Sequence, residues 1–357
     1  MQNNSSPYCK LPWTNLYMRY GGKVQPCCQN STSLGNINDK DFIFDNVWNG
    51  EKIQNIRQLI IDNKYEEAGC NKNCNILYNI RKTGEMELFS PGIVEAATKN
   101  KIFSDNISLL KNELSMKNIK IDSFPIMWDI QPTEACNMRC IMCHQDHTNP
   151  KKLNSDSIER ILKINHQVIY SLCVQGGEVF IDQKYKDLLL NLKESFSEYQ
   201  TIQVITNASL LSYSDLDKMT QGDNPIKFII SADGVDEQIF KSIRQSSHFN
   251  KVMNNIKYLS KIQMKKNLSN IIQWNFVVMK SNFFQIKEAL KLSSQLNIEI
   301  NFQGIMGEYE NENIFNYNLI DKEEALTYIN DTISLSEKLN TKASNLHVIK
   351  QKLEDLE

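Results

Sequence analysis

The sequence predicts an α/β fold in which helices alternate with the strands of a parallel sheet. Six short apolar runs alternate with stretches whose apolar residues recur at helical spacing. Strands that are buried on both faces have apolar runs of this kind, and their alternation with helices indicates a parallel sheet. Six units of this kind predict a partial (β/α)6, TIM-like barrel. The expected strands are 126–131, 168–174, 202–206, 226–231, 272–279 and 298–303, and the expected helices 155–166, 183–196, 213–220, 250–263 and 283–296.

The remaining sequence predicts two further parts around this barrel. Residues 1–115 are expected to form a small α+β module with a helical linker, 116–310 the barrel, and 311–357 C-terminal helices at 321–339 and 342–356. Within the module, Gly21 and Gly22 separate two short strand-like runs and predict a two-residue hairpin turn. The 357 residues suffice for a barrel-sized domain with small additions.

Composition and charge exclude several classes of partner. The net charge of −2 argues against a large basic surface, so we expect no nucleic acid. Apolar runs all fall short of a membrane span, so we expect no membrane partner. The first six residues lack the basic start and apolar core of a secretory signal, which predicts a cytoplasmic protein.

The strongest chemical signal is Cys136, Cys140 and Cys143, spaced as C-x3-C-x2-C. Three thiolates can hold three irons of a [4Fe-4S] cube and leave the fourth iron open to a small molecule. A structural zinc site is the alternative, with His144 as a possible fourth ligand. Closed zinc sites normally use two ligand pairs, however, and His144 directly adjoins Cys143.

This spacing resembles the signature of the radical S-adenosylmethionine (SAM) superfamily, and the resemblance extends over about residues 120–305. It implies that SAM chelates the open iron through its amino and carboxylate groups. It further implies that an electron from the reduced cluster cleaves SAM to a 5′-deoxyadenosyl radical. An external one-electron reductant of the flavodoxin or ferredoxin type is then expected as a partner.

Segments downstream match further motifs of this family in the expected order. Gly176-Gly177-Glu178 is similar to the GGE motif, in which glycines admit a close ligand and the carboxylate pairs with the SAM ammonium. Met142 stands where an aromatic residue is usual; methionine is adaptable enough to pack there, and how adenine is gripped stays open. The residues that the resemblance implies for SAM binding are Met142, Gly176, Gly177, Glu178, Asn207, Ser231, Arg244 and Gln303.

A second set of cysteines lies in the N-terminal module. Its order resembles the SPASM or twitch module, which holds an auxiliary [4Fe-4S] cluster and usually follows the barrel, whereas here it precedes it. The resemblance implies one auxiliary cluster with these ligands: Cys9, Cys27, Cys70 and Cys74, with Cys28 as the substitute for Cys27. A zinc site and disulfides are the alternatives, and the missing secretory signal disfavours disulfides.

Two single residues have both a structural and a catalytic interpretation. Cys173 lies inside an expected strand, where a small buried core residue is the plain interpretation. The alternative is a thiol that returns a hydrogen atom to a substrate radical, as in some peptide epimerases of the superfamily. Asp233, followed by Gly234, is either a turn residue or a catalytic base.

The sequence therefore predicts an enzyme that abstracts hydrogen from its substrate through SAM cleavage. Since SPASM and twitch modules commonly accompany peptide modification, a peptide or protein substrate is the first expectation. A dehydrogenase, epimerase or mutase acting on a small molecule or carbohydrate is the second. A non-catalytic electron-transfer or regulatory iron-sulfur protein is a remote third.

Overall fold

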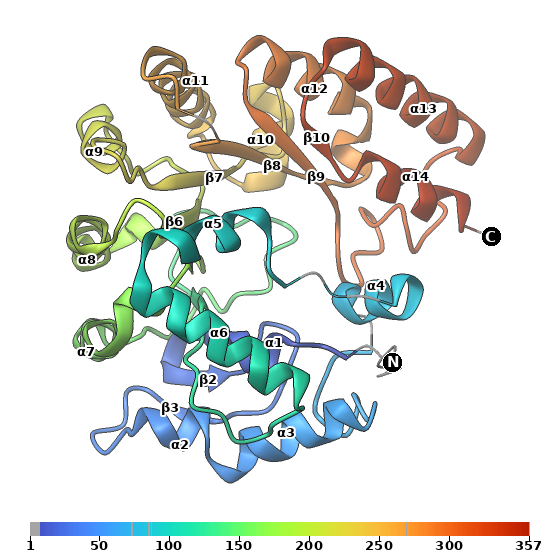
Figure 1. The fold of residues 1–357 in the computed structure, drawn as a ribbon. Coiled ribbons are helices and arrows are strands. Elements are labelled where there is room, and N and C mark those ends of the chain that lie inside the picture. The colour runs from blue at the N-terminus through green and yellow to red at the C-terminus, as the bar shows by residue number, and fades with distance from the viewer. Residues whose placement is uncertain (1–7, 73, 85, 87, 269, 357) are drawn as a thin grey trace. The chain divides into compact units, whose positions relative to one another are not determined.

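The computed structural model describes residues 8–72, 74–84, 86, 88–268 and 270–356. Two compact parts can be distinguished along the chain (Figure 1). The first comprises Met1–Ala135, Asn149–Val179 and Gln183–Gln203, and the second Cys136–Thr148, Phe180–Asp182 and Val204–Glu357. Each part is described separately below.

The first part is built on mixed strands in the order β5-β4-β1-β2-β3. Its strands are β1 (Asn15–Met18), β2 (Lys23–Gln25), β3 (Gly35–Asn36), β4 (Met127–Ile130) and β5 (Ser171–Val174). β1 and β5 flank β4 in parallel, whereas β2 and β3 continue from β1 in antiparallel order. The N-terminal hairpin thus extends the parallel sheet, a pairing between strands more than 100 residues apart that no local pattern predicts.

The turn of this hairpin is longer than predicted. A 3₁₀ turn, Tyr20–Gly22, lies between β1 and β2, and the Arg19 backbone N–H donates to the Lys23 carbonyl oxygen at 2.8 Å. Gly21 and Gly22 have φ values of 76° and 91°, a left-handed conformation that favours glycine. The position of the turn is therefore confirmed, but its two-residue length is wrong.

Helices cover these strands around an aromatic core. They are α1 (Leu11–Thr14), α2 (Phe44–Trp48), α3 (Glu51–Ile61), α4 (Asn75–Thr83), α5 (Pro91–Lys99), α6 (Lys101–Ser115), α7 (Ser155–Asn165) and α8 (Gln183–Ser195), with a 3₁₀ turn at His166–Val168. Arg57 on α3 is fully buried, lies over the Trp48 ring at 4.8 Å and donates to the carbonyls of Pro12 and Ile119. This arginine joins segments that are far apart in the sequence.

The second part has parallel strands with helices packed against them (Figure 1). Its strands are β7 (Lys227–Ser231), β8 (Ile272–Val278), β9 (Glu299–Gly304) and β10 (Ala343–Ser344), and β6 (Thr201–Thr206) begins in the first part and ends in the second. Its helices are α9 (Tyr213–Met219), α10 (Glu237–Arg244), α11 (Phe249–Lys265), α12 (Ile286–Gln295), α13 (Lys322–Leu339) and α14 (Leu346–Glu354). A 3₁₀ turn at Lys280–Gln285 also belongs to this part, and another, Val179–Ile181, begins in the first part and ends in the second.

The predicted α/β class, with a mostly parallel sheet, is confirmed, and the expected strands and helices occur within a few residues of their predicted bounds. The last helix starts at Leu346 rather than 342 because Ala343 and Ser344 pair with β9.

The expectation that the strands are buried on both faces is wrong. Along β8 and β7, buried residues alternate with half-buried ones, so one face of each strand is only partly covered. That face carries the polar residues Ser231, Asn275 and Asn301, in register across β7, β8 and β9.

Across the described ranges, every helix is too short or too polar to cross a membrane.

Candidate functional site

The loop with Cys136, Cys140 and Cys143 belongs to the second part, where contacts from distant segments hold it. The Cys143 backbone N–H donates to the Cys140 carbonyl at 3.0 Å, and the Ile141 N–H donates to the carbonyl of Ile243 at the end of α10 at 2.9 Å. Tyr309, in the segment after β9, donates its hydroxyl to the Met142 carbonyl at 2.8 Å. Met142 also packs against a buried cluster of Ile243, Met279 and Ile305. The cysteine loop is thus anchored between Cys140 and Cys143.

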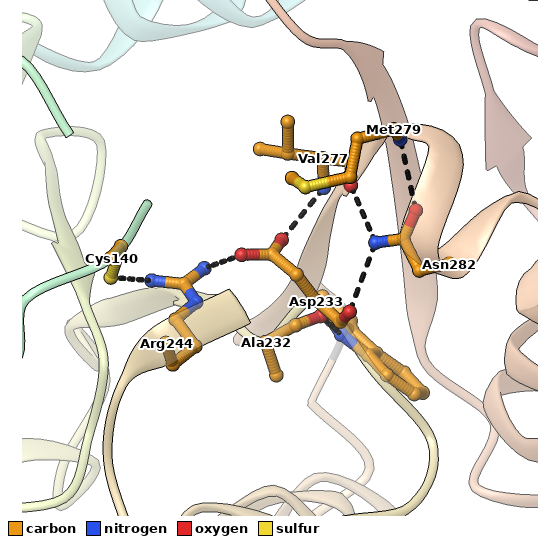
Figure 2. Close-up of polar contacts among 8 residues, drawn as sticks. Cys140, Ala232, Asp233, Arg244, Val277, Met279 and Asn282 are labelled. Carbon is orange, nitrogen blue, oxygen red and sulfur yellow. Dashed lines mark hydrogen bonds and ion pairs between the residues drawn. The ribbon is translucent and has the colours of Figure 1, made fainter. Parts of the chain in front are cut away.

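A buried charged network reaches the sulfur of Cys140 (Figure 2). Arg244, the last residue of α10, places its Nη2 2.6 Å from Asp233 Oδ2 and its Nη1 3.7 Å from Cys140 Sγ. Asp233 is 0% exposed and accepts the Val277 backbone N–H at 2.7 Å. The Asn282 side chain donates to the carbonyls of Asp233 and Val277. Asp233, which was expected to be a turn residue or a catalytic base, therefore forms a buried ion pair with Arg244, and Arg244 also contacts the sulfur of Cys140.

The electrostatics of this network favour a charged arginine. Burial lowers the pKa of Arg244, but Asp233 and then Cys140 raise it, so that it lies above its ordinary value overall. Burial raises the pKa of Cys140, and Arg244 opposes that shift. The guanidinium is consequently the group that favours a thiolate at Cys140.

Asn207 approaches the first cysteine of the loop from the end of β6. Its amide Nδ2 lies 3.0 Å from Asn137 Oδ1 and 3.9 Å from Cys136 Sγ. Ser209 orients this amide by donating to its Oδ1 from both the backbone and the hydroxyl. The resemblance implied a role for Asn207 in SAM binding, and the structure brings it beside Cys136.

Gly176, Gly177 and Glu178 follow β5 in the first part and pack against the chain just before the cysteine loop. The Gly177 and Glu178 N–H groups donate to the carbonyls of Thr133 and Ala135, each at 2.8 Å. A Cβ at Gly177 would fall 2.2 Å from the Ala135 carbonyl oxygen, so only glycine fits this close approach. Glu178 is 0% exposed.

The other residues that the resemblance implied lie on β7 and β9. Ser231 is the last residue of β7, is half-buried and pairs with Asn275 of β8. Gln303, near the end of β9, is exposed and pairs with Val277. Asn275 was missed from the sequence, although it accepts the Asn301 amide at 3.0 Å on the same face. Its position two residues before Val277 in an otherwise apolar run was the available signal.

Five cysteines gather in the first part, within the N-terminal module. Cys9, Cys27 and Cys74 are buried, Cys70 is half-buried and Cys28 is exposed. Burial raises the pKa of Cys9 to about 12, with Cys70 and Cys74 adding to the shift. Burial likewise raises the pKa of Cys27, and Cys28, Cys9 and Cys70 add to it. These mutual effects mean that the thiols lie near one another.

The donor set of this module fits an iron-sulfur cluster chemically. None of the nine cysteines forms a disulfide, and thiols are the usual cluster ligands. Asn30 donates to Cys70 Sγ at 3.7 Å, the kind of amide contact that accompanies cluster thiolates. Within the part of the chain that the structure describes, no three His, Cys, Asp or Glu side chains meet closely enough to hold a single metal ion.

Cys173 occurs in a cross-strand row that the sequence did not reveal. Tyr17 of β1, Asp129 of β4 and Cys173 of β5 stand at paired positions of adjacent strands. Burial raises the pKa of Asp129 to about 6, although Asn15 and Cys173 oppose this shift. Burial, then Asp129 and Cys28, raise the pKa of Cys173 to about 12, so its thiol stays protonated. The pairing of β4 with β5 therefore places the Asp129 carboxyl group beside the Cys173 thiol.

Comparisons with known proteins agree with these features. Residues 130–276 match the family model of the radical SAM superfamily, and residues 9–75 match the SPASM iron-sulfur cluster-binding domain. The GTP 3′,8-cyclase of Clostridium botulinum (strain Okra) is 27% identical over 211 residues, covering 57% of this chain and 64% of the cyclase. The antilisterial bacteriocin subtilosin biosynthesis protein AlbA of Bacillus subtilis is 25% identical over 141 residues, covering 38% of this chain and 31% of AlbA.

Among solved structures, Streptococcus suis SuiB is similar in fold. It is 15% identical and has a TM-score of 0.50, over 83% of this chain and 64% of SuiB. At this identity the likeness concerns the fold alone. The chain spans less than two-thirds of the length of the cyclase and of SuiB.

Proposed function

Since the chain belongs to the radical SAM superfamily and carries a SPASM domain N-terminal to its radical SAM domain, we propose that it is a radical enzyme acting on a peptide or protein. The radical SAM domain implies a [4Fe-4S] cluster that binds SAM, and the SPASM domain implies auxiliary iron-sulfur clusters. The single observation that carries the proposal is the anchored loop with Cys136, Cys140 and Cys143. When bound, the cluster supplies the electron that cleaves SAM to methionine and a 5′-deoxyadenosyl radical.

The residues of this chain have separate tasks in this proposal. Cys136, Cys140 and Cys143 hold the SAM-binding cluster, while Tyr309 and the Ile243 carbonyl keep their loop in place. Gly176, Gly177 and Glu178 bind the amino group of SAM. Met142, Asn207, Ser231, Arg244 and Gln303 are the further SAM-binding residues that the sequence resemblance implies. Cys9, Cys27, Cys70 and Cys74 hold an auxiliary cluster, with Cys28 as the substitute for Cys27.

A modified peptide is favoured over a small molecule by the N-terminal cluster domain and by the similarity to AlbA, a bacteriocin biosynthesis protein. The second candidate is a nucleotide or another small molecule, favoured by the similarity to GTP 3′,8-cyclase. Both require an external one-electron reductant of flavodoxin or ferredoxin type. Cysteines without disulfides suit a reducing compartment, which supports a cytoplasmic location.

Cys173 is proposed as the residue that returns a hydrogen atom to the substrate radical. The supporting observations are its place beside Asp129 on the paired strand and the raised pKa of its thiol, since only the protonated thiol can give up a hydrogen atom. A Cys173→Ala variant should still cleave SAM but should release little modified product. Product formation at the rate of the unsubstituted protein would remove Cys173 from the mechanism.

The main test is SAM cleavage by the full chain after anaerobic reconstitution with iron and sulfide. Dithionite and SAM should give 5′-deoxyadenosine, detected by mass spectrometry, and Cys140→Ala should abolish it. The matched control is Asp331→Asn, which removes a partly exposed ion pair with Lys287 far from the cysteines in sequence and should leave the yield unchanged. No 5′-deoxyadenosine from well-loaded protein would favour the electron-transfer or regulatory alternative.

Two further assays separate the substrates and the clusters. GTP incubated with the active protein tests the nucleotide candidate, because consumption of GTP would contradict a peptide substrate.

Iron per chain in a variant with Cys136, Cys140 and Cys143 all changed to Ala tests the auxiliary cluster. About four irons should remain; none remaining would leave the N-terminal cysteines without a cluster.

A further inference from the structure

Arg244 has an unusual set of contacts for a residue in a simple ion pair. It is 7% exposed and divides its guanidinium between two acceptors, the Asp233 carboxylate at 2.6 Å and the Cys140 sulfur at 3.7 Å. Its Nε is buried and finds no hydrogen-bond partner among the described residues. The guanidinium thus contacts a carboxylate and a cysteine sulfur at the same time.

The position of Asp233 explains why Arg244 is held there. Val277 donates to one carboxylate oxygen and Asn282 donates to the Asp233 carbonyl, so this aspartate is fixed from two sides (Figure 2). Asn282 is itself 1% exposed and accepts the Met279 N–H at 2.9 Å. A rigid carboxylate at the end of β7 therefore determines where the guanidinium points.

We propose that Arg244, held by Asp233, is a positioning residue that tunes the cluster bound at Cys140 by donating a hydrogen bond to its sulfur. Hydrogen bonds to ligating sulfurs and nearby positive charge favour the reduced cluster, which carries one more negative charge. The pair thus makes the SAM-binding cluster easier to reduce. This inference rests on the proposed function, because it requires a cluster at Cys136, Cys140 and Cys143.

The chemistry needs no group beyond those already named. One electron enters the cluster from the external reductant, no bond forms or breaks at Arg244, and its protons stay in place. The guanidinium suits this role because it remains protonated and presents several donors in a rigid plane. A lysine would keep the charge but could not reach the carboxylate and the sulfur with the same fixed geometry.

The test is an anaerobic redox titration of the reconstituted full chain, followed by electron paramagnetic resonance. The signal that changes when SAM is added to the unsubstituted protein identifies the SAM-binding cluster and separates it from any auxiliary cluster. All variants are then titrated without SAM and followed at that signal. In Arg244→Gln, iron per chain should be retained. At the midpoint potential of the unsubstituted protein, however, the ratio of reduced to oxidised cluster should fall about tenfold, equivalent to about 59 mV for a one-electron couple. Arg244→Lys should recover part of this loss.

A second variant guards against misfolding, because Arg244→Gln leaves the Asp233 carboxylate buried without its partner. Arg244→Gln combined with Asp233→Asn removes both charges and keeps two amides of similar shape. It should show the same lowered ratio, whereas Asp331→Asn, which removes an ion pair of the same part of the chain, should not change it. Unchanged potentials in both Arg244 variants that bind iron normally would overturn the inference. Failure of the unsubstituted protein to show a SAM-responsive cluster would instead overturn the proposed function.

Discussion

Cys173 on β5 stands beside Asp129, its paired residue on β4, and burial, followed by this carboxylate, raises the pKa of its thiol to about 12. Burial also raises the pKa of Asp129, and Asn15 on β1, whose side-chain amide donates to the Pro26 carbonyl at 3.2 Å, opposes that shift. The hairpin of the N-terminal module is therefore part of the environment of both groups. The protonation states of Cys173 and Asp129 therefore depend on the packing of this hairpin against β4.

The first prediction concerns the pH dependence of stability at Asp129. Burial raises its pKa from 3.8 to about 6, so between these values the folded protein binds a proton that the unfolded chain releases. Stability that Asp129 contributes is thus fully present below pH 3.8 and is lost as pH rises through about 6. Asp129→Asn stays neutral and should be more stable than the unsubstituted protein at pH 7.5, by roughly 1–3 kcal/mol.

Thermal unfolding of the metal-free protein at pH 4 to 7.5 measures this effect. The melting temperatures of the two proteins should diverge across the pH window and meet at its acid end. Asp217→Asn, which alters an exposed carboxylate bonded to Tyr258, serves as the control. An Asp129→Asn protein that is less stable at pH 7.5 would mean that the carboxylate is ionised and well paired in the fold.

The second prediction concerns Gly177. A Cβ there would lie 2.2 Å and 2.5 Å from the carbonyl oxygens of Ala135 and Glu134, which are backbone atoms that cannot turn aside. Gly177→Ala should therefore displace the chain before Cys136 and reduce both SAM binding and 5′-deoxyadenosine yield at least about tenfold, a loss of roughly 1.4 kcal/mol. Gly84→Ala is the matched control, because Gly84 has φ +74° but nothing within 4 Å of its Cβ position. Equal SAM binding in both variants would contradict this role of Gly177.

The third prediction concerns the anchor at Tyr309. Tyr309→Phe removes the hydrogen bond to the Met142 carbonyl and keeps the ring, so overall stability should fall by only about 1 kcal/mol. The cysteine loop should become more mobile, and the cluster should be lost faster in air. Bleaching of the cluster absorbance after exposure to oxygen measures this. Tyr317→Phe removes an exposed hydrogen bond to Glu308 in the same segment and should bleach at the unsubstituted rate.

The fourth prediction concerns Arg57 in the first part. Burial lowers its pKa to about 9, yet its guanidinium satisfies the carbonyls of Pro12 and Ile119 and lies over Trp48. Arg57→Ala should destabilise the protein by roughly 3–5 kcal/mol, because it leaves a cavity and two unpaired carbonyls. Chemical denaturation followed by tryptophan fluorescence measures the loss, and Arg160→Ala, at an exposed position of α7, should change little. A small effect at Arg57 would show that the module tolerates its absence.

Much of the fold was predictable because the apolar periodicity is local. The apolar-rich runs 202–206 and 272–279 occur as β6 and β8 with nearly the predicted bounds, since period and composition act within each segment. The parallel pairing of β1 with β4 was not predictable, because it joins segments more than 100 residues apart. The half-buried state of Asn275 within β8 was not predictable either, because it depends on how fully neighbouring elements cover that face of the sheet.

The sequence by itself determined the similarity to the radical SAM and SPASM families, because the cysteine spacing and the Gly-Gly-Glu segment depend only on residue order and lie within the matched residues. Only the tertiary structure decided which groups act on those residues. Arg244 reaches Cys140 because Asp233 is fixed by β8, and Cys173 meets Asp129 because β4 and β5 pair in one register. Such contacts depend on long-range packing and burial, which set hydrogen-bond partners and pKa values but leave no local pattern in the chain.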